Sequence, residues 1–219
     1  MLKFQQILMD MPLFKGISAE DLEPMLQCLG AQSACYQKND AVFLEGAQVR
    51  SIGVVLSGKI QVVREDYYGN RNIVANLGPG ELFAETFACA AVQSVPVSVF
   101  AAEKSEILLL DCKKILSPCP SSCGFHRLLI ENLVQVMARK NLFLSGKLDL
   151  LSRRTTREKL IAYLSGEAKK AGQSDFVIPF KRQELADYLG VERSAMSAQL
   201  CRMRDEGILE FNRNHFRLL

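Results

Sequence analysis

Three cysteines and one histidine fall within fifteen positions of the chain and have side chains that can bind metal or change redox state. They are Cys112, Cys119, Cys123 and His126. Three thiols and an imidazole form the ligand set of a Cys3His metal site, and a helix would place the last three on one face. Two prolines, Pro118 and Pro120, interrupt the segment, and cysteine often serves only to pack. Three interpretations therefore stay open: packing residues, a metal or cluster site, and a redox-active thiol pair.

Two carboxylates, Glu81 and Glu85, are spaced as a pair that could serve acid–base catalysis. No histidine or nucleophile pattern accompanies them, and His215 lies near the C-terminus. The sequence therefore predicts that the chain is not an enzyme.

Packing is the favoured role for the cysteines, so no metal or iron–sulfur cofactor is predicted.

Hydrogen-bond donors recur at helical spacing near the C-terminal end of the sequence. The donors are Arg193, Ser194, Ser197, Arg202 and Arg204. Such side chains suit the base edges and phosphate oxygens of DNA. The apolar residues of the same stretch form the opposite face of the predicted helix: Val191, Met196, Leu200 and Met203.

A shorter helical pattern precedes this stretch, with Leu185, Ala186 and Leu189 on its inner side. Gly190 lies between the two patterns and permits the left-handed backbone conformation of a sharp turn. Ala186 is small where the two helices would cross, which lets them pack closely. The layout is typical of a helix-turn-helix, whose second helix enters the major groove of DNA. The alternative is an ordinary helical hairpin.

Residues 208–219 read as two short strands around Asn212, Arg213 and Asn214. Asparagine tolerates positive φ, so the sequence predicts a tight hairpin here. A small basic hairpin after a recognition helix is the wing of a winged helix, and Arg213 could reach a phosphate from it. This arrangement favours a regulator over an enzyme.

The composition of the 219 residues, 48% of them hydrophobic, predicts two domains with buried cores. Residues 1–118 hold 10 Lys and Arg against 13 Asp and Glu, a net charge of −3, whereas residues 150–219 hold 13 against 9, a net charge of +4. The basic excess thus lies with the predicted DNA-binding pattern. No apolar run is long enough to cross a bilayer and no signal peptide is recognised. We therefore expect a cytoplasmic protein without membrane contact, whose seven cysteines are not structural disulfides.

Helices and short strands alternate with turns before residue 118. Residues 1–30 form an amphipathic helical pattern with a break at Met11 and Pro12, and Ser18 can cap a helix that runs to about Leu29. Extended runs then follow between Gly and Asn turns, at residues 42–44, 52–56, 59–64, 72–77, 95–101 and 106–110. Short strands at this spacing predict an antiparallel barrel or jelly roll, so the fold class is α+β.

A long helix is predicted from about residue 122 to residue 151, about 40 Å in length. Its apolar residues follow a spacing close to a heptad: Phe125, Leu129, Leu133, Val136, Phe143, Leu144 and Leu150. This stripe favours a parallel contact between two subunits, and the alternative is a core helix of one domain. A further helix at residues 153–166 and a strand at residues 176–180 are predicted to open the C-terminal domain.

The order of these elements, together with four sequence stretches, resembles the CRP/FNR superfamily of bacterial transcription regulators. The stretches are DMPLF at residues 10–14, IGVVLSGK at 52–59, GELFAE at 80–85 and RQELADYLG at 182–190. The resemblance implies a β-roll sensor domain (double-stranded β-helix) at 1–118, a dimerisation helix at 119–151 and a winged helix-turn-helix at 152–219. It also implies a homodimer on a two-fold symmetric site in double-stranded DNA, with half-sites about 34 Å apart. RNA polymerase would be a partner if the protein activates transcription.

The base-reading positions of the family correspond here to Arg193, Ser194, Ser197 and Ala198. An arginine at the first position can donate two hydrogen bonds to guanine. The usual glutamate is Ser194 and the usual second arginine is Ala198, whereas Ser197 matches a serine of the oxygen-sensing branch. We therefore expect an operator that differs from those of the two best-known branches. Four further residues complete the predicted DNA-binding set: Arg182, Gln183, Arg202 and Arg213.

The effector pocket implied by the resemblance lacks the groups that bind a cyclic phosphate. Phe83, Ala84 and Glu85 match the segment that holds the ribose in cyclic-nucleotide-binding members. Val95 and Pro96 stand where those members place an arginine and a serine or threonine, and proline has no N–H donor. The complete predicted set is Gly80, Phe83, Ala84, Glu85, Thr86, Val95, Pro96, Asn141, Leu144 and Ser145.

We therefore predict that cyclic AMP and cyclic GMP do not bind, because a buried anion without a partner costs several kcal/mol. Leu144 and Ser145 fall where the family has its adenine-contacting Thr-Ser, so that wall is more apolar too. A small apolar or aromatic effector is expected instead, with an empty roll as the alternative. The competing hypothesis is a redox or metal sensor that uses the cysteine group. The N-terminal iron–sulfur cluster of the oxygen sensors is not supported, since Cys28 and Cys35 are too few and too widely spaced.

Overall fold

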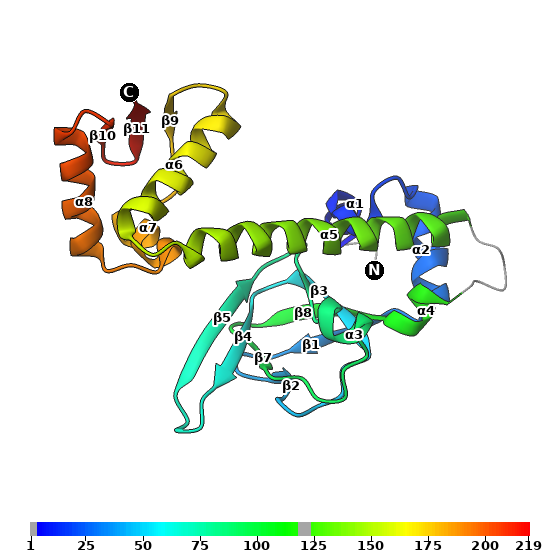
Figure 1. The fold of residues 1–219 in the computed structure, drawn as a ribbon. Helices are drawn as coiled ribbons and strands as arrows, with labels where there is room; N and C mark the ends of the chain where they lie inside the picture. The colour runs from blue at the N-terminus through cyan, green and yellow to red at the C-terminus, as the bar shows by residue number, and fades with distance from the viewer. Residues whose placement is uncertain (1–3, 118–123) are drawn as a thin grey trace. The chain divides into compact units, whose positions relative to one another are not determined.

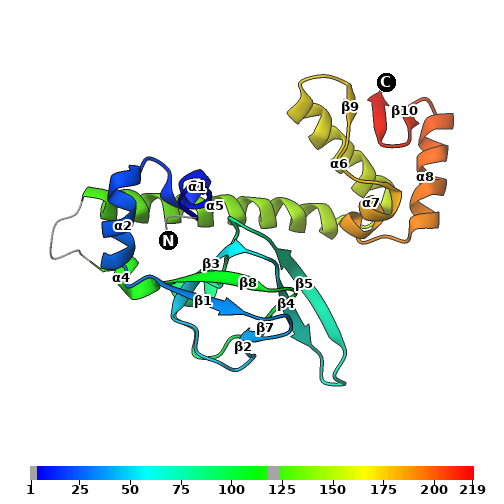
Figure 2. The ribbon, with the colours of Figure 1, turned by 180° about the vertical axis from the view of Figure 1, so that it is seen from behind.

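The computed structural model describes residues 4–117 and 124–219 (Figures 1 and 2). It divides into two compact units, Met1–Ala138 and Arg139–Leu219. Helices and antiparallel strands are both present, so the predicted α+β class is confirmed. The predicted division at residues 118 and 151 stays a prediction. Among the described residues, no helix combines the length and the apolar composition that crossing a bilayer requires.

The first unit begins with helix α1 (Gln5–Asp10), the short 3-10 helix η2 (Pro12–Phe14) and helix α2 (Ala19–Cys28). Met11 has extended backbone angles, as the residue before a proline prefers, so the predicted break is confirmed. The Ser18 hydroxyl accepts the backbone N–H of Asp21 (3.1 Å), so the predicted cap is confirmed as well.

Two four-stranded antiparallel sheets follow, with strand orders β1-β8-β3-β6 and β2-β7-β4-β5. Their strands are β1 (Gln32–Tyr36), β2 (Ala41–Phe43), β3 (Ser51–Ser57), β4 (Ile60–Glu65), β5 (Arg71–Leu77), β6 (Leu82–Phe83), β7 (Ser98–Ala101) and β8 (Ser105–Asp111). Six of them agree with the predicted strands to within three residues. Strands β1 and β6 were not predicted, and the predicted strand at 95–101 begins only at Ser98.

The interior of this roll is filled by side chains from both sheets: Val55, Ile60, Phe83, Val99 and Ile107. The Phe83 ring lies directly over Gly53, where an added Cβ would come within 2.1 Å of the ring. Phe83 also stacks with Phe43, with ring centroids 6.5 Å apart. Gly53 is therefore required by close packing.

Two short helices complete the first unit, and neither was predicted from the sequence. Helix α3 (Glu85–Cys89) follows β6, and helix α4 (Cys112–Leu116) follows β8. The carboxylate of Asp111 caps α4 by accepting the backbone N–H of Lys113 (2.8 Å). These two helices place a cysteine each, at the end of α3 and at the start of α4.

Helix α5 (Gly124–Ser152) is the long helix of the prediction. Leu129 and Leu133 are buried in the core of the first unit, and Phe125 and Val136 pack against that core. The Asn132 amide donates to the carbonyl oxygens of Leu13 (3.0 Å) and Lys15 (2.8 Å).

The prediction that the apolar stripe of α5 faces a second subunit is therefore wrong for most of its residues. The four residues just named face the core of their own unit, and Leu150 is buried in the core of the second unit. The exposed apolar side chains on α5 include two residues of that stripe, Phe143 and Leu144, together with Val134, Leu142, Leu148 and Leu151. Both faces of the helix are apolar, so the predicted stripe combined residues of the two faces.

The second unit continues with α6 (Thr156–Ala171), β9 (Asp175–Val177), α7 (Arg182–Leu189), α8 (Arg193–Asp205), β10 (Leu209–Asn212) and β11 (His215–Leu218). Helix α6 begins three residues later than predicted because Thr155 and Glu158 form a capping box at its start. It ends at Gly172, which has left-handed backbone angles. The three strands pair in the order β10-β11-β9.

Candidate nucleic-acid interface and effector pocket

Helices α7 and α8 form a helix-turn-helix around Gly190, which adopts the predicted left-handed conformation (φ 59°, ψ 48°). The backbone N–H of Val191 donates to the Ala186 carbonyl oxygen (3.0 Å) and closes the turn. Ala186 is fully buried between the elements of this unit, together with Leu185 and Leu189. The residue types around Gly190 were therefore sufficient to predict this turn.

Helix α8 separates its two faces as predicted. Met196, Leu200 and Met203 are buried, whereas Arg193, Ser194, Ala198 and Arg202 are exposed. Ser197 is half-buried, and its hydroxyl donates to the Arg193 carbonyl oxygen one turn earlier (2.9 Å). The structure thus brings the predicted base-reading residues together on the outer face of one helix.

A glutamate that the sequence analysis did not single out begins this helix. The Glu192 carboxylate accepts the backbone N–H of Ala195 (2.8 Å) and the hydroxyl of Ser194. These two interactions, the serine hydroxyl first, lower the pKa of Glu192 below its usual value. The Ser194 hydroxyl is therefore already engaged within the helix end. Glutamate is not among the residues preferred at a helix N-cap, so the sequence offered no signal for this one.

A hollow of about 300 Å³ lies between α8 and the start of α6, next to Ala198 and Arg202. Its other wall includes Thr156 and Arg157, which the sequence analysis did not include among the candidate residues. Arg157 forms an ion pair with Glu206 (2.6 Å) at the end of α8. The start of α6 thus lies next to the outer face of α8, which carries the predicted base-reading residues.

Arg182 and Arg213 occupy different environments, although both were predicted to contact DNA. The Arg182 guanidinium lies over the rings of Phe211 (4.8 Å) and Phe216 (5.1 Å) in the wing. Burial lowers the pKa of Arg182, although an arginine stays charged in proteins. Arg182 therefore fastens the wing strands to α7.

The wing is a two-residue hairpin between β10 and β11, as the sequence suggested. Arg213 is exposed at its tip and has the left-handed conformation (φ 53°) that the sequence predicts for an asparagine. Asn214 instead donates from its amide to the Ile178 carbonyl oxygen (3.1 Å). Gln183, the other predicted contact on α7, is exposed and donates to Asp187 (2.9 Å).

The predicted effector residues Phe83, Ala84, Glu85 and Thr86 follow one another at the start of α3. Ala84 has left-handed backbone angles (φ 62°, ψ 1°) and precedes the helix as its N-terminal capping residue. Glu85 is buried, Thr86 is exposed, and Phe83 belongs to the interior of the roll. Phe83 is thus a packing residue.

The other predicted pocket residues do not all join this group. Val95 is fully buried, and its backbone N–H donates to the Ala47 carbonyl oxygen (3.0 Å), whereas Pro96 is exposed. Gly80 borders a separate hollow of about 330 Å³ beside Met11 and Pro12. Three further residues are exposed on the part of α5 that belongs to the second unit: Asn141, Leu144 and Ser145.

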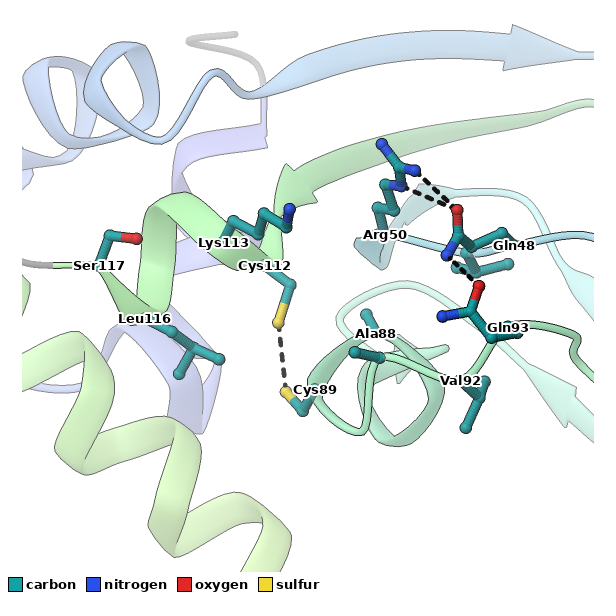
Figure 3. Close-up of a pocket in the computed structure, with 12 residues that line it drawn as sticks. Gln48, Arg50, Ala88, Cys89, Val92, Gln93, Cys112, Lys113, Leu116 and Ser117 are labelled. Atoms are coloured by element: carbon teal, nitrogen blue, oxygen red, sulfur yellow. Dashed lines mark hydrogen bonds between the residues drawn. The ribbon is translucent and has the colours of Figure 1, made fainter.

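Of the predicted cysteine group, Cys119 and Cys123 lie outside the described residues. Cys112 is buried, and its sulfur lies 3.4 Å from the sulfur of Cys89, which the sequence analysis missed (Figure 3). The His126 Nε2 donates to the Ile115 carbonyl oxygen (2.9 Å), and its buried Nδ1 has no hydrogen-bond partner within the described residues. Residues 4–117 and 124–219 hold no group of three or more His, Cys, Asp or Glu placed to bind a metal ion.

Family models match two parts of the chain. The model described as a cyclic nucleotide-binding domain matches residues 34–119, and the model described as a Crp-like helix-turn-helix domain matches residues 158–219. The first match covers the roll and the second covers the helix-turn-helix with its wing.

Curated proteins with similar sequences are regulators. The chain is 28% identical over 201 residues to the cyclic AMP receptor protein of Thermus thermophilus, a match that covers 90% of this chain and 88% of that protein. It is 23% identical over 193 residues to the transcriptional activator protein FnrA of Stutzerimonas stutzeri, over 84% of this chain and 75% of that protein.

Solved structures show the same fold. The crystal structure of the Thermus thermophilus catabolite activator protein matches with a TM-score of 0.56 and 27% identity, and the match covers 95% of this chain and 93% of that one. The c-di-GMP-responsive global regulator CLP of Xanthomonas campestris matches with a TM-score of 0.51 and 18% identity, over 92% of this chain and 99% of that one.

Proposed function

Since this chain belongs to the CRP/FNR superfamily of transcription regulators, we propose that it acts in the cytoplasm as a homodimer that binds a two-fold symmetric DNA site. Its relatives are transcription regulators, which supports a regulatory rather than a catalytic role. RNA polymerase is a further partner if the protein activates transcription.

The observation that carries the proposal is the outer face of α8. Arg193, Ser194 and Ala198 are exposed side by side at the start of a helix whose inner face is fully packed. Arg193 can donate two hydrogen bonds to a guanine, and Ala198 can contact a thymine methyl group. Arg202 on the same face and Arg213 on the wing are placed for phosphate contacts.

Selection of binding sites from random double-stranded DNA by the full chain tests this proposal. We expect an enriched sequence with two-fold symmetry and half-sites about 34 Å, or one helical turn, apart. Enrichment of a single asymmetric half-site would contradict the homodimer, and binding without enrichment would contradict sequence-specific recognition.

The exposed side of α5 supports the homodimer. Val134, Asn141 and Leu148 recur at seven-residue intervals. Leu144 and Leu151, three residues after Asn141 and Leu148, occupy the second contact position of the same heptad. A stripe of this spacing forms the contact seam of a two-stranded coiled coil. An asparagine within such a seam favours a parallel pair in one register, because its amide then meets the amide of its counterpart. We therefore assign Asn141 to the dimer contact.

The proposed effector binds the roll near the start of α3 and is not cyclic AMP. Val95, at the position of the phosphate-binding arginine, is fully buried, and its backbone N–H already donates to the Ala47 carbonyl oxygen in the segment between β2 and β3. Pro96 has no N–H to offer. The Glu85 carboxylate at the start of α3 can accept a hydrogen bond from a hydroxyl, so a small, mainly apolar effector with a hydroxyl fits the residues best.

A further inference from the structure

Two thiols that come from distant parts of the sequence meet at the edge of a pocket in the first unit. Cys89 is the last residue of α3, and Cys112 is the first residue of α4. The backbone N–H of Cys112 donates to the Arg50 carbonyl oxygen (3.1 Å), which fixes the start of α4 against β3. The chain after Cys89 reverses through Ala91, which has left-handed backbone angles.

The two sulfur atoms are 3.4 Å apart and share a hydrogen bond. A disulfide bond is about 2.05 Å long, so the sulfurs must approach each other by about 1.4 Å to form one. Small side-chain rotations can supply such a movement, because Cys89 is only half-buried at its helix end.

The two thiols differ in acidity and exposure. The hydrogen bond with Cys112 lowers the pKa of Cys89, although burial and the charge of Glu85 oppose this effect. The same hydrogen bond raises the pKa of Cys112, and burial adds to the increase. Since Cys89 is half-buried and Cys112 is buried, a molecule in the pocket reaches the Cys89 sulfur first, and Cys112 is the partner thiol behind it.

The pocket of about 360 Å³ beside these thiols gives a small molecule access to them (Figure 3). On its far side, Arg50 donates to the Gln48 side-chain oxygen (2.7 Å), and Gln48 donates to Gln93 (3.0 Å). Lys113 and the apolar side chains of Leu116 and Val92 also line the pocket.

We propose that Cys89 and Cys112 form a two-electron redox site that a small peroxide converts to a disulfide. The Cys89 thiolate attacks one peroxide oxygen, the O–O bond breaks, and a sulfenic acid forms on Cys89 while the second oxygen leaves, with one proton taken up, as water or an alcohol. The Cys112 sulfur then attacks the Cys89 sulfur, its proton joins the departing hydroxide, and a disulfide and one water are formed. The dithiol has lost two electrons, and the peroxide has gained them.

The disulfide would fasten the end of α3 to the start of α4. Helix α3 begins at Glu85, the group proposed to hold the effector, so oxidation would restrict the wall of the proposed effector site. This regulatory consequence rests on the proposed function. The oxidation itself does not, since it depends only on the two thiols and their pocket.

Peptide mapping by mass spectrometry tests the redox site on the full-length reduced protein. The protein is treated with one equivalent of hydrogen peroxide, alkylated under denaturing conditions and digested without reductant. We expect a peptide pair joined through Cys89 and Cys112, which a dithiol reductant separates. The exposed cysteines Cys28, Cys35 and Cys201 should be found alkylated. Alkylation of both Cys89 and Cys112, or pairing of either with another cysteine, would overturn the proposal.

Two variants identify the role of each thiol. In Cys112→Ala, the sulfenic acid on Cys89 has no partner, so dimedone should trap it at Cys89, whereas Cys89→Ala should give no adduct at Cys112. Cys35→Ser is the matched control and should form the Cys89–Cys112 link as the wild type does. A dimedone adduct on Cys112 in the Cys89→Ala variant would show that the proposed order of the two thiols is wrong.

Operator binding of the reduced and oxidised wild-type protein tests the consequence separately. We expect a several-fold change in affinity on oxidation that is absent in Cys89→Ala. A disulfide that forms without changing the affinity would refute the regulatory consequence and leave the redox site standing. If no DNA site is ever selected, the proposed function fails, while the peptide map still decides the chemistry.

Discussion

Arg193 is the first residue of the recognition helix, and its exposed side chain lies on the outer face of α8, where its donors can reach a base edge. Arg193→Ala should weaken binding to the selected operator by about 1–3 kcal/mol and relax discrimination at one base pair. The reason is that an arginine with two bonds to guanine reads a base as well as adding charge. Binding titrations with the operator and its single-base variants measure both effects.

Arg213 at the wing tip is the matched control for Arg193. Arg213→Ala should weaken binding about equally for all DNA sequences and reduce the slope of log affinity against log salt by about 1, as expected for one lost phosphate contact. An Arg193→Ala variant that behaves in the same uniform way would show that Arg193 also contacts only phosphate.

Ala91 carries a backbone strain that a single substitution can remove. Its φ of 49° lies in the left-handed region, which costs a residue with a Cβ roughly 1–2 kcal/mol. Ala91→Gly should therefore raise the free energy of unfolding, by about 0.5–1 kcal/mol after the extra entropy of glycine is counted. The neighbouring Ala90 has ordinary helical angles, so Ala90→Gly should lower the free energy of unfolding by a similar amount. Urea unfolding of both variants decides, and stabilisation by both would contradict this account.

Single residues were predictable where their role depends on sequence neighbours. Ser18 and Gly190 both act within a few positions, and the structure confirms them. Cys89 was not predictable, because its partner lies 23 positions away and only the fold brings the two sulfurs together. The conformation of Arg213 was missed because asparagine, on either side of it, tolerates positive φ more readily.

At the scale of elements, helix α5 shows how periodicity can find a helix and still fail to orient it. Its spacing predicted the element correctly, but two apolar faces run along it. The face that carries Leu129 and Leu133 is buried against the N-terminal helices of the first unit. Charges at Leu133 would therefore damage the core, and a test of the dimer must use the exposed face.

Leu148→Asp tests the dimer on that exposed face. A buried pair of like charges in the seam should convert the dimer to monomers and weaken operator binding strongly, because each monomer then holds one half-site alone. Phe143→Asp is the matched control: Phe143 is also exposed, 62% against 69% for Leu148, but lies about 140° around the helix axis. Light scattering measures the state of assembly. A monomeric wild type, with and without DNA, would refute the homodimer.

The strands show the same limit as α5. Strands bounded by Gly and Asn turns were found, since turn residues mark their ends. Strand β1 was missed because its residues, Gln32–Tyr36, are largely polar and exposed at the edge of a sheet. Strand β6 has two residues, Leu82–Phe83, and is too short for any alternation to reveal it.

At the scale of the whole molecule, the order of the elements allowed the family to be recognised from sequence. The side chains that line the predicted effector pocket could not be identified in the same way. The family position of Phe83 suggested a pocket wall, yet its ring packs over Gly53 inside the roll. Residue types alone could not show this, because an aromatic side chain suits both roles.

Cyclic AMP should not bind the full-length protein at physiological concentrations. The reason is the buried Val95 at the position of the phosphate-binding arginine, where an anion would lack a partner. Calorimetric titration of the purified protein with cyclic AMP should give no heat of binding. Low-micromolar binding that Glu85→Ala leaves unchanged would show that the pocket has been misplaced.

Helix α3 is enclosed at both ends by alanines in the left-handed conformation, Ala84 and Ala91. Both residues are relieved of strain when the helix unwinds, so the local opening free energy of this five-residue segment should be among the lowest in the roll. In hydrogen-exchange terms, the amide of Ala88 should exchange well before that of Val54 in the doubly paired strand β3. The segment that carries both Glu85 and Cys89 would then be the part of the roll that the least free energy can rearrange.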